Sequence, residues 1–250
     1  MKKNRLSYSA LCAFKKSPNH LLKYWEGKTK VTDAMQFGSI IHKLLLEPES
    51  FNDDYAIFTG ARRAGKDWQE FKAANEDKQI IKLSELDDAN AIAENALQNP
   101  IFKKLMQNKV HTEKEVTWNH AGIDFKGFVD LESKIGGRTI VCDIKTTTDA
   151  GKRFQRDLLY NDYKMQAAMY LENYGDVDYY IIAVETVSPY NVQVYRLCYN
   201  IIEQGYWEYC MLVEKYNGWN GEPVGYSKYV IDVESNDSPM VHNLTKNKNK

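Results

Sequence analysis

Cysteine is scarce in this sequence, which has only four in its 250 residues. No two of them form a CxxC pair or show the spacing of zinc ligands, so the pattern argues against a disulfide framework and against a structural zinc site. Scattered cysteines of this kind are typical of a reducing compartment, and we therefore expect a cytoplasmic protein.

Long apolar runs and an excess of charge are missing as well. No run approaches the roughly 18 apolar residues that span a bilayer, and the basic N-terminus has an apolar part too short for a secretory signal. The 33 Lys and Arg residues are balanced by 34 Asp and Glu residues. A hydrophobic share of 43% and an aromatic share of 12% exclude disorder as the main state and predict a folded, soluble protein without a membrane partner.

Helical periodicity dominates the first hundred residues. Ser7 can cap the first helix, Pro48 ends a helix whose apolar residues recur at the spacing of a buried face, and Ser84 with Asp87 resembles a capping box. A short strand is expected at residues 55–58. The helices expected here cover residues 8–16, 21–25, 34–47, 67–75 and 84–98, with a further one beginning at Pro100.

Strand patterns begin after residue 110. Three stretches that alternate or run apolar, separated by turn residues, predict an antiparallel meander at residues 113–118, 124–132 and 139–145. A helical segment follows, then two more strands and a last helix, and the NKNK end is expected to fray. These later segments cover residues 152–174, 179–186, 192–197 and 201–216. The chain is therefore predicted to be an α/β protein.

Two carboxylates and an amine converge in this meander. Asp130 closes one predicted strand, and Asp143-Ile144-Lys145 closes the next one, across a Gly-Gly turn. Because side chains alternate along a strand, Asp143 and Lys145 point to the same face, and the Ile144 carbonyl lies near the same edge. Carboxylate and carbonyl oxygens are the ligands that Mg²⁺ or Mn²⁺ prefers. An isolated DxK pattern is nevertheless more often a simple ion pair.

Three further patterns add to this one, although each also has an ordinary structural explanation. Glu115 lies on the preceding strand, where an exposed glutamate is common. His42 lies on the buried helix, one turn after Gly38, where a histidine is more often a satisfied core residue. Gln166 and Tyr170 are spaced to share one face of a later, half-buried helix.

The ordered motifs GSIIH, EKEV, GFVD, CDIKTT and QAAMY resemble those of the PD-(D/E)xK nuclease superfamily, in the branch with RecB-like nuclease domains. The stretches RLSYSALCAFKKSPNHLLKY, GSIIHKLLLEPESF and RRAGKDWQEFKAAN are similar to the exodeoxyribonuclease VIII (RecE-type) exonucleases of phages and prophages. The resemblance implies an α/β, restriction-endonuclease-like fold with a central mixed sheet flanked by helices. It also implies a Mg²⁺- or Mn²⁺-dependent exodeoxyribonuclease that degrades one strand of linear double-stranded DNA from its 5′ end.

The resemblance also implies roles for individual residues. Gln166 and Tyr170 match a supporting QxxxY motif, which we expect to orient the site or to touch DNA. Lys145 matches the catalytic lysine, which would position or deprotonate the attacking water. The implied metal ligands are His42, Asp130, Asp143 and the Ile144 backbone carbonyl, and the implied catalytic residues are Lys145, Asp143, Asp130 and Glu115.

Residues 60–66 fit the GxxxxGK pattern of a phosphate-binding P-loop. Asp67 follows where a P-loop needs a Ser or Thr hydroxyl on Mg²⁺, and the short strand before the loop is not expected to start a βαβ unit, so a nucleotide triphosphatase is rejected. We interpret Arg62, Arg63 and Lys66 instead as contacts to DNA phosphates, as the similar basic loop of the resembled family implies. A solvated loop explains these three residues nearly as well.

We expect one structural domain with three segments along the sequence. Residues 1–100 form a helical region that contributes the His42 helix to the site, residues 101–217 form the nuclease core, and residues 218–250 form a C-terminal extension. The resemblance further implies phage-type DNA recombination beside a single-strand annealing protein, and a homo-oligomeric ring. Two alternatives stay open: a metal-dependent endonuclease or single-strand nuclease with the same site, and a non-catalytic DNA-binding protein.

Overall fold

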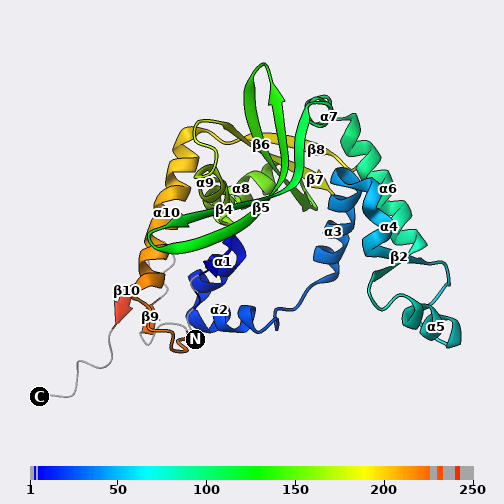
Figure 1. Cartoon of the computed structure of the whole chain (residues 1–250), viewed down its shortest axis with the longest axis horizontal. Coiled ribbons are helices and arrows are strands. Elements are labelled where there is room, and N and C mark those ends of the chain that lie inside the picture. The colour runs from blue at the N-terminus through cyan, green and yellow to red at the C-terminus, as the bar shows by residue number, and fades with distance from the viewer. Residues whose placement is uncertain (1–2, 4, 226–229, 233–239, 243–250) are drawn as a thin grey trace, which may run out of the picture.

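A mixed β-sheet of six strands runs through the centre of the molecule (Figure 1). The computed structural model describes residue 3 and residues 5–225, 230–232 and 240–242 of the chain. The strand order is β1-β5-β6-β7-β8, and β4 pairs with β5. The strands of this sheet are β1 (Arg5–Leu6), β4 (Lys109–His120), β5 (Ile123–Ile135), β6 (Arg138–Thr147), β7 (Asp178–Glu185) and β8 (Val192–Arg196).

The meander predicted from the sequence is confirmed. Strands β4, β5 and β6 are antiparallel neighbours, β7 pairs with β6 in parallel, and β8 returns antiparallel to β7. The turn between β5 and β6 is made by Gly136 and Gly137, whose φ angles of 60° and 82° lie in the region that glycine adopts without steric cost. The mixed sheet flanked by helices is the fold class that the sequence predicted.

Helices cover both faces of this sheet. Adjacent side chains of β6 enter different cores: Val141 packs with residues of α1, α9 and α10, and Cys142 packs with residues of α3, α6 and α7. The helices are α1 (Tyr8–Lys16), α2 (Pro18–Trp25), α3 (Asp33–Leu46), α4 (Phe51–Asp54), α5 (Lys66–Ala74), α6 (Leu83–Gln98), α7 (Pro100–Gln107), α8 (Lys152–Tyr160), α9 (Tyr163–Leu171) and α10 (Tyr199–Gly218).

Both cores combine residues from either side of position 100. Leu11 of α1 packs in one core and Ile41 of α3 in the other, each against strands of the later segment. The division into segments 1–100, 101–217 and 218–250 stays a prediction. Of the last segment, the structure describes residues up to 225 and the small antiparallel pair β9 (Val230–Asp232) and β10 (Met240–His242). The NKNK end that we expected to fray lies outside the described residues.

Local capping agrees with the sequence at α1 and differs at α6. The backbone N–H of Ala10 donates to the Ser7 hydroxyl at 3.2 Å, as expected of an N-cap serine. The predicted capping box of Ser84 and Asp87 is wrong, because α6 begins one residue earlier. Glu85 reaches back to accept from the backbone N–H of Lys82 at 2.7 Å, which is the reciprocal half of a capping box in a different register.

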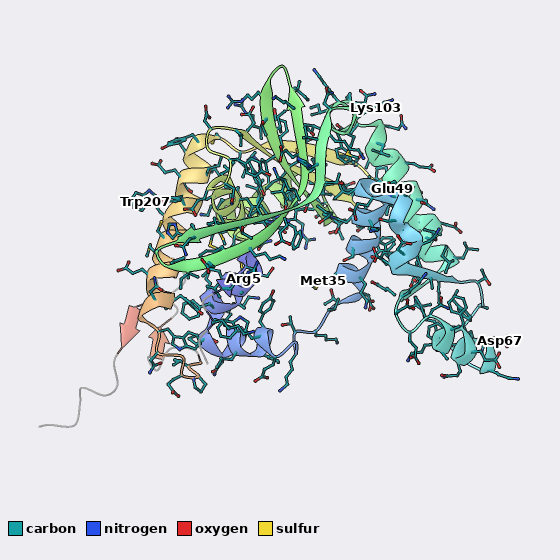
Figure 2. All side chains as sticks on the ribbon, in the orientation of Figure 1. Arg5, Met35, Glu49, Asp67, Lys103 and Trp207 are labelled. Carbon is teal, nitrogen blue, oxygen red and sulfur yellow. The ribbon has the colours of Figure 1, made fainter. Side chains whose placement is uncertain are left out.

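Two short strands beside α5 correct a second expectation. Strand β2 (Tyr55–Phe58) pairs in parallel with β3 (Gln79–Lys82), and α5 connects them. The strand at 55–58 therefore does start a small βαβ unit, contrary to the sequence analysis, and the argument against a P-loop rests on Asp67 alone. Asp67 lies on α5 at the outer edge of the molecule (Figure 2).

The edge of β5 that faces away from β4 is shared by two partners. Strand β1 pairs with Asp124 and Phe125 at one end, and β6 pairs with residues 131–135 at the other. Among the described strands, none pairs with this edge between residues 126 and 130. The sheet therefore leaves an open stretch of strand that ends at Asp130.

Candidate active site

Three acidic residues form a row across the neighbouring strands β4, β5 and β6. Thr112 lies opposite Leu131 and Lys114 opposite Val129, which places Glu113 opposite Asp130. Leu131 lies opposite Cys142, and the same register continued by one residue brings Asp130 next to Asp143. Because directly opposite residues of antiparallel strands share a face, the three carboxylates are neighbours by construction of the sheet.

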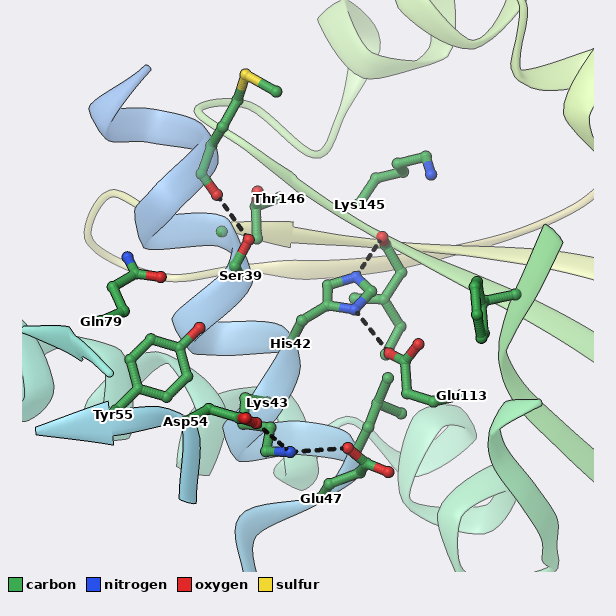
Figure 3. Close-up of a pocket in the computed structure, with 15 residues that line it drawn as sticks. Ser39, His42, Lys43, Glu47, Asp54, Tyr55, Gln79, Glu113, Lys145 and Thr146 are labelled. Atoms are coloured by element: carbon green, nitrogen blue, oxygen red, sulfur yellow. Dashed lines mark hydrogen bonds and ion pairs between the residues drawn. The ribbon is translucent and has the colours of Figure 1, made fainter. Parts of the chain in front are cut away.

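Helix α3 adds an imidazole to this row (Figure 3). His42 Nε2 lies 2.8 Å from the backbone carbonyl oxygen of Ile144 and 3.5 Å from Asp130 Oδ2, and His42 Nδ1 lies 3.7 Å from Glu113 Oε1. The close approach of α3 to β6 requires Gly38, because a Cβ at this position would lie 2.8 Å from the Thr146 hydroxyl oxygen.

The structure thus gathers His42, Glu113 and Asp130 into a group whose ligating atoms all lie within 4.8 Å of one another. The Ile144 carbonyl belongs to the same place, because it contacts the imidazole. Two carboxylates, a carbonyl and an imidazole are a donor set that suits a divalent cation such as Mn²⁺ or Mg²⁺. The residues present therefore fit a bound metal ion.

Asp143 is held somewhat differently from the expectation. Its Oδ1 accepts a hydrogen bond from Gln166 Nε2 at 2.8 Å, and its Oδ2 lies 2.6 Å from Lys145 Nζ. Oδ2 is buried, and the ion pair with the Lys145 ammonium is its close contact among the described residues. The structure therefore places Asp143 beside the group of His42, Glu113 and Asp130, with one buried oxygen that only the Lys145 ammonium contacts closely.

Burial and charge shift the pKa values of these groups strongly. Burial alone lowers the pKa of His42, but pairing with Glu113, the charge of Asp130 and the hydrogen bond to Ile144 outweigh it and raise the pKa to about 9. Burial, followed by the charge of Asp143, raises the pKa of the Asp130 carboxyl well above its ordinary value. At neutral pH, before a cation binds, the imidazole is therefore protonated.

Lys145 is held as a cation by its surroundings. Burial lowers the pKa of its amine, but the charges of Asp143 and Asp130 outweigh this and raise the pKa above its ordinary value. Its Nζ also lies 5.3 Å from the ring centroid of Tyr163, at a distance suited to a cation–π contact. A charged ammonium donates hydrogen bonds and stabilises anions, whereas it cannot accept a proton.

The two residues of the QxxxY motif both support the strands that carry the carboxylates. Gln166 holds Asp143, as described above. The ring of Tyr170 packs on β5 where Gly127 leaves room, because a Cβ at Gly127 would come within 2.5 Å of this ring. Trp118 of β4 contacts the same ring edge to face, with 6.1 Å between the centroids. Tyr170 is thus buried against the GFVD motif that ends in Asp130.

A pocket of about 750 Å³ opens onto this group. Its walls come from α3, β4, β5 and β6 and from the segment around β2. His42, Glu113 and Lys145 line one part of it, and Lys43 and Tyr55 line another part (Figure 3). Of the candidate metal ligands, His42, Glu113 and Ile144 therefore line a pocket open to solvent, whereas Asp130 is not among its lining residues.

The structure does not bring Glu115 to this group. Its carboxylate pairs with Lys126 at 2.6 Å and lies 3.9 Å from Arg5, and its cross-strand neighbour is Phe128 rather than Asp130. Glu113 is the acidic residue that the sequence analysis missed. Its φ of 47° places a non-glycine residue in the left-handed region, and such outliers are concentrated at functional sites.

The basic loop lies apart from the pocket. None of Arg62, Arg63 and Lys66 lines it. Arg63 NH2 pairs with Glu85 at 2.6 Å and donates to the Ile80 carbonyl at 3.2 Å. Lys66 is largely exposed, and its Nζ lies 3.6 Å from Glu70. The proposed phosphate contacts of this loop stay a prediction.

The order of strands, the row of carboxylates and the lysine beside it are those of a PD-(D/E)xK-type fold. The chain belongs to the family of PDDEXK-like domains of unknown function (DUF3799), whose model matches residues 7–222. The predicted membership of the PD-(D/E)xK superfamily is thereby confirmed, and the narrower likeness to RecE-type exonucleases stays a prediction.

One solved structure shares this fold at low sequence identity. The crystal structure of a "putative exonuclease" from Eubacterium rectale is 15% identical, with a TM-score of 0.59 over 86% of this chain and 82% of that chain. That of the protein SSO0001 is also 15% identical, with a TM-score of 0.43 over 87% of this chain and 77% of that chain. No curated protein matches the chain. Among the described residues, no helix has the length and apolar character needed to cross a membrane.

Proposed function

We propose that this protein is a metal-dependent nuclease that hydrolyses phosphodiester bonds of DNA. The observation that carries the proposal is the row of Glu113, Asp130 and Asp143 across three strands, with His42 on one side and the Lys145 ammonium on the other. Hydrolysis of a phosphodiester places negative charge on the transition state and on the leaving oxygen, and this row fits both a divalent cation and a fixed ammonium.

Each residue has a distinct task in this proposal. His42, Glu113, Asp130 and the Ile144 carbonyl would hold the cation, with Asp143 beside them and paired with Lys145. The cation would lower the pKa of a water molecule and neutralise charge on the phosphate. Lys145 stays protonated, so it orients the attacking water and stabilises the pentavalent transition state by donating hydrogen bonds, rather than by removing a proton. Gln166 keeps the Asp143 carboxylate in its orientation.

The finer assignment is an exodeoxyribonuclease that degrades linear double-stranded DNA from the 5′ end in phage-type recombination. It is supported by the ordered motifs that resemble RecE-type enzymes and by the fold shared with a protein described as an exonuclease. Mg²⁺ or Mn²⁺ as the cofactor, an annealing protein as a partner, a homo-oligomeric ring and a cytoplasmic location belong to the same proposal.

The experiment that tests it is digestion of linear duplexes whose 5′ or 3′ ends are blocked, with and without Mg²⁺ or Mn²⁺. Circular duplexes and single strands serve as competing substrates. We expect metal-dependent release of nucleotides from linear duplexes that stops when the 5′ ends are blocked. Cutting of circles would instead identify an endonuclease, a preference for single strands would identify a single-strand nuclease, and salt-dependent binding without any cleavage would identify a DNA-binding protein. Asp130→Asn is the matched control for contaminating nucleases.

A further inference from the structure

Phe128 is a large apolar side chain that the fold leaves exposed inside the candidate active site. It is 45% exposed and belongs to neither hydrophobic core, whereas Phe125, three residues earlier on the same strand, is fully buried. Phe128 lines the pocket together with His42, Glu113 and Lys145. Within the chain the ring is contacted by the Lys126 ammonium, and its exposed part lines the pocket, where a ligand can contact it.

The backbone places this ring at a fixed distance from the metal ligands. Phe128 lies two residues before Asp130 on β5, on the same face of the strand, which corresponds to roughly 7 Å along it. Both residues fall in the stretch of β5 that has no strand partner on its outer edge among the described strands. A strand of nucleic acid that puts a phosphate at Asp130 therefore brings an adjoining nucleotide to Phe128.

One cation lies beside the ring, and a second lies near Glu115. Lys126 Nζ lies 4.9 Å from the centroid of the Phe128 ring. Glu115 contacts Lys126 at 2.6 Å and Arg5 at 3.9 Å, so that it holds both cations near β5. Two positive charges and one negative charge leave this end of the site positive, which suits the backbone of a polyanion. Glu115, which lies outside the group of His42, Glu113 and Asp130, thereby acquires a positioning role.

We propose that Phe128 stacks on a nucleobase next to the phosphate that is cut, and that this base has an open face. The inference rests on the proposed nuclease function and adds to it the form in which the substrate enters. A base inside a duplex is stacked on both faces and cannot offer a face to a side chain, whereas the last base of an end or a base of a single strand can. The enzyme thus acts at an end or on a single strand, and not inside an intact duplex.

The proposal is tested by DNA binding in Ca²⁺, with gels to verify that no strand is cut. Phe128→Leu keeps an apolar side chain and removes the ring, and Phe128→Trp keeps a stacking surface. Trp207→Leu is the matched control, because Trp207 is also exposed but lies on α10, away from the pocket (Figure 2). Thermal melting of each variant shows whether it is folded. We expect Phe128→Leu to weaken binding of a single-stranded oligonucleotide roughly 5- to 150-fold, and the other two variants to bind like the wild type.

Abasic oligonucleotides identify the ligand of the ring. The probes are single strands that each carry one abasic residue, at successive positions along the series. At one position we expect the missing base to weaken binding by the wild type, but to cause no further loss in Phe128→Leu, which already lacks the ring. Equal affinity of Phe128→Leu and wild type for the intact strand would overturn the proposal. So would a loss of affinity from the abasic residue that adds to the loss from Phe128→Leu at every position. Either result would leave the ring free for an apolar partner. Failure of the wild type to cleave any DNA in Mg²⁺ or Mn²⁺ would instead refute the proposed function, so the two failures are distinguishable.

Discussion

The sequence suggests functions for two groups of charged residues, the carboxylates of the sheet and the basic residues near α5. Their surroundings in the fold differ strongly. The carboxylates of Asp130 and Asp143 lie in the sheet with side chains only 12% and 3% exposed, and each contacts other members of the site. Lys66 lies at the start of α5 and Arg63 in the loop before it, with side chains 85% and 39% exposed. They pair with the surface carboxylates of Glu70 and Glu85.

The difference shows what turns charges into a site. Like charges that are buried side by side repel, so the folded chain must supply counter-charges, and here these are Lys145 and the protonated His42. The negative charge of the crowded carboxylates therefore attracts a divalent cation. In the exposed loop, water screens each charge, and a surface ion pair contributes little. Substitutions in the two groups should therefore have effects that differ in kind as well as in size.

The largest effect is expected for Lys145→Ala. Loss of the ammonium removes a hydrogen-bond donor from the transition state, which should lower the rate of cleavage about 100- to 1,000-fold, while binding of DNA in Ca²⁺ survives. Single-turnover cleavage of an end-labelled duplex measures this, and Lys103→Ala on the outer helix α7 is the control. Retained turnover of a folded Lys145→Ala protein would reject the role of this lysine.

A contrast between two neighbouring glutamates should come next in size. Glu113→Gln removes a charged ligand and is expected to weaken Mn²⁺ binding about 10- to 100-fold, because Glu113 is opposite Asp130. Glu115→Gln should leave Mn²⁺ binding unchanged, because this residue is opposite Phe128. Calorimetric titration of each variant with Mn²⁺ measures the two affinities and shows which glutamate binds the metal ion. The reverse result would restore Glu115 as the acidic ligand and refute the register argument.

The pH dependence of metal binding should follow the protonation of His42. Because the pKa of the imidazole is raised to about 9, a cation that binds at pH 7 must displace its proton. The affinity for Mg²⁺ should therefore rise with pH, by up to about tenfold per pH unit, and level off above pH 9. Titrations in two buffers with different ionisation enthalpies count the released protons. Binding at pH 7 without proton release would show that His42 is not a ligand.

Much of the fold could be predicted from the sequence, because hydrophobic periodicity was strong where the sheet and the long helices lie. His42 and the Ile144 carbonyl meet as expected, since Gly38 lets α3 approach β6. Strand β2 was predicted at its observed residues, whereas its partner β3 was not predicted. They have four residues each, and β3 carries no clear alternation, so that only its parallel partner and the neighbouring helices define it.

Glu113 was not predicted because the register of strands β4 and β5 depends on the turn that joins them. Ala121 and Gly122 have φ angles of 49° and 81°, and they form a two-residue hairpin that pairs His120 with Ile123. Counting back from this pair sets the register of the hairpin as far as His111, beyond which it shifts, and places residue 113 opposite Asp130. The strands expected from the sequence end at residue 118 and resume at residue 124, and these bounds give no register from which to choose between the two glutamates.

The smallest effect is expected in the basic loop. If Arg62 and Lys66 contact DNA phosphates, alanine at either position should weaken binding only a few-fold and lower the slope of log affinity against log salt by about one. Arg63→Ala should act on stability instead, because its guanidinium is already paired with Glu85 and bonded to the Ile80 carbonyl. Fluorescence anisotropy with a labelled duplex at several salt concentrations separates these effects. An unchanged salt slope for both Arg62→Ala and Lys66→Ala would make the loop a solvated surface and would confine DNA recognition to the sheet, beside the buried carboxylates.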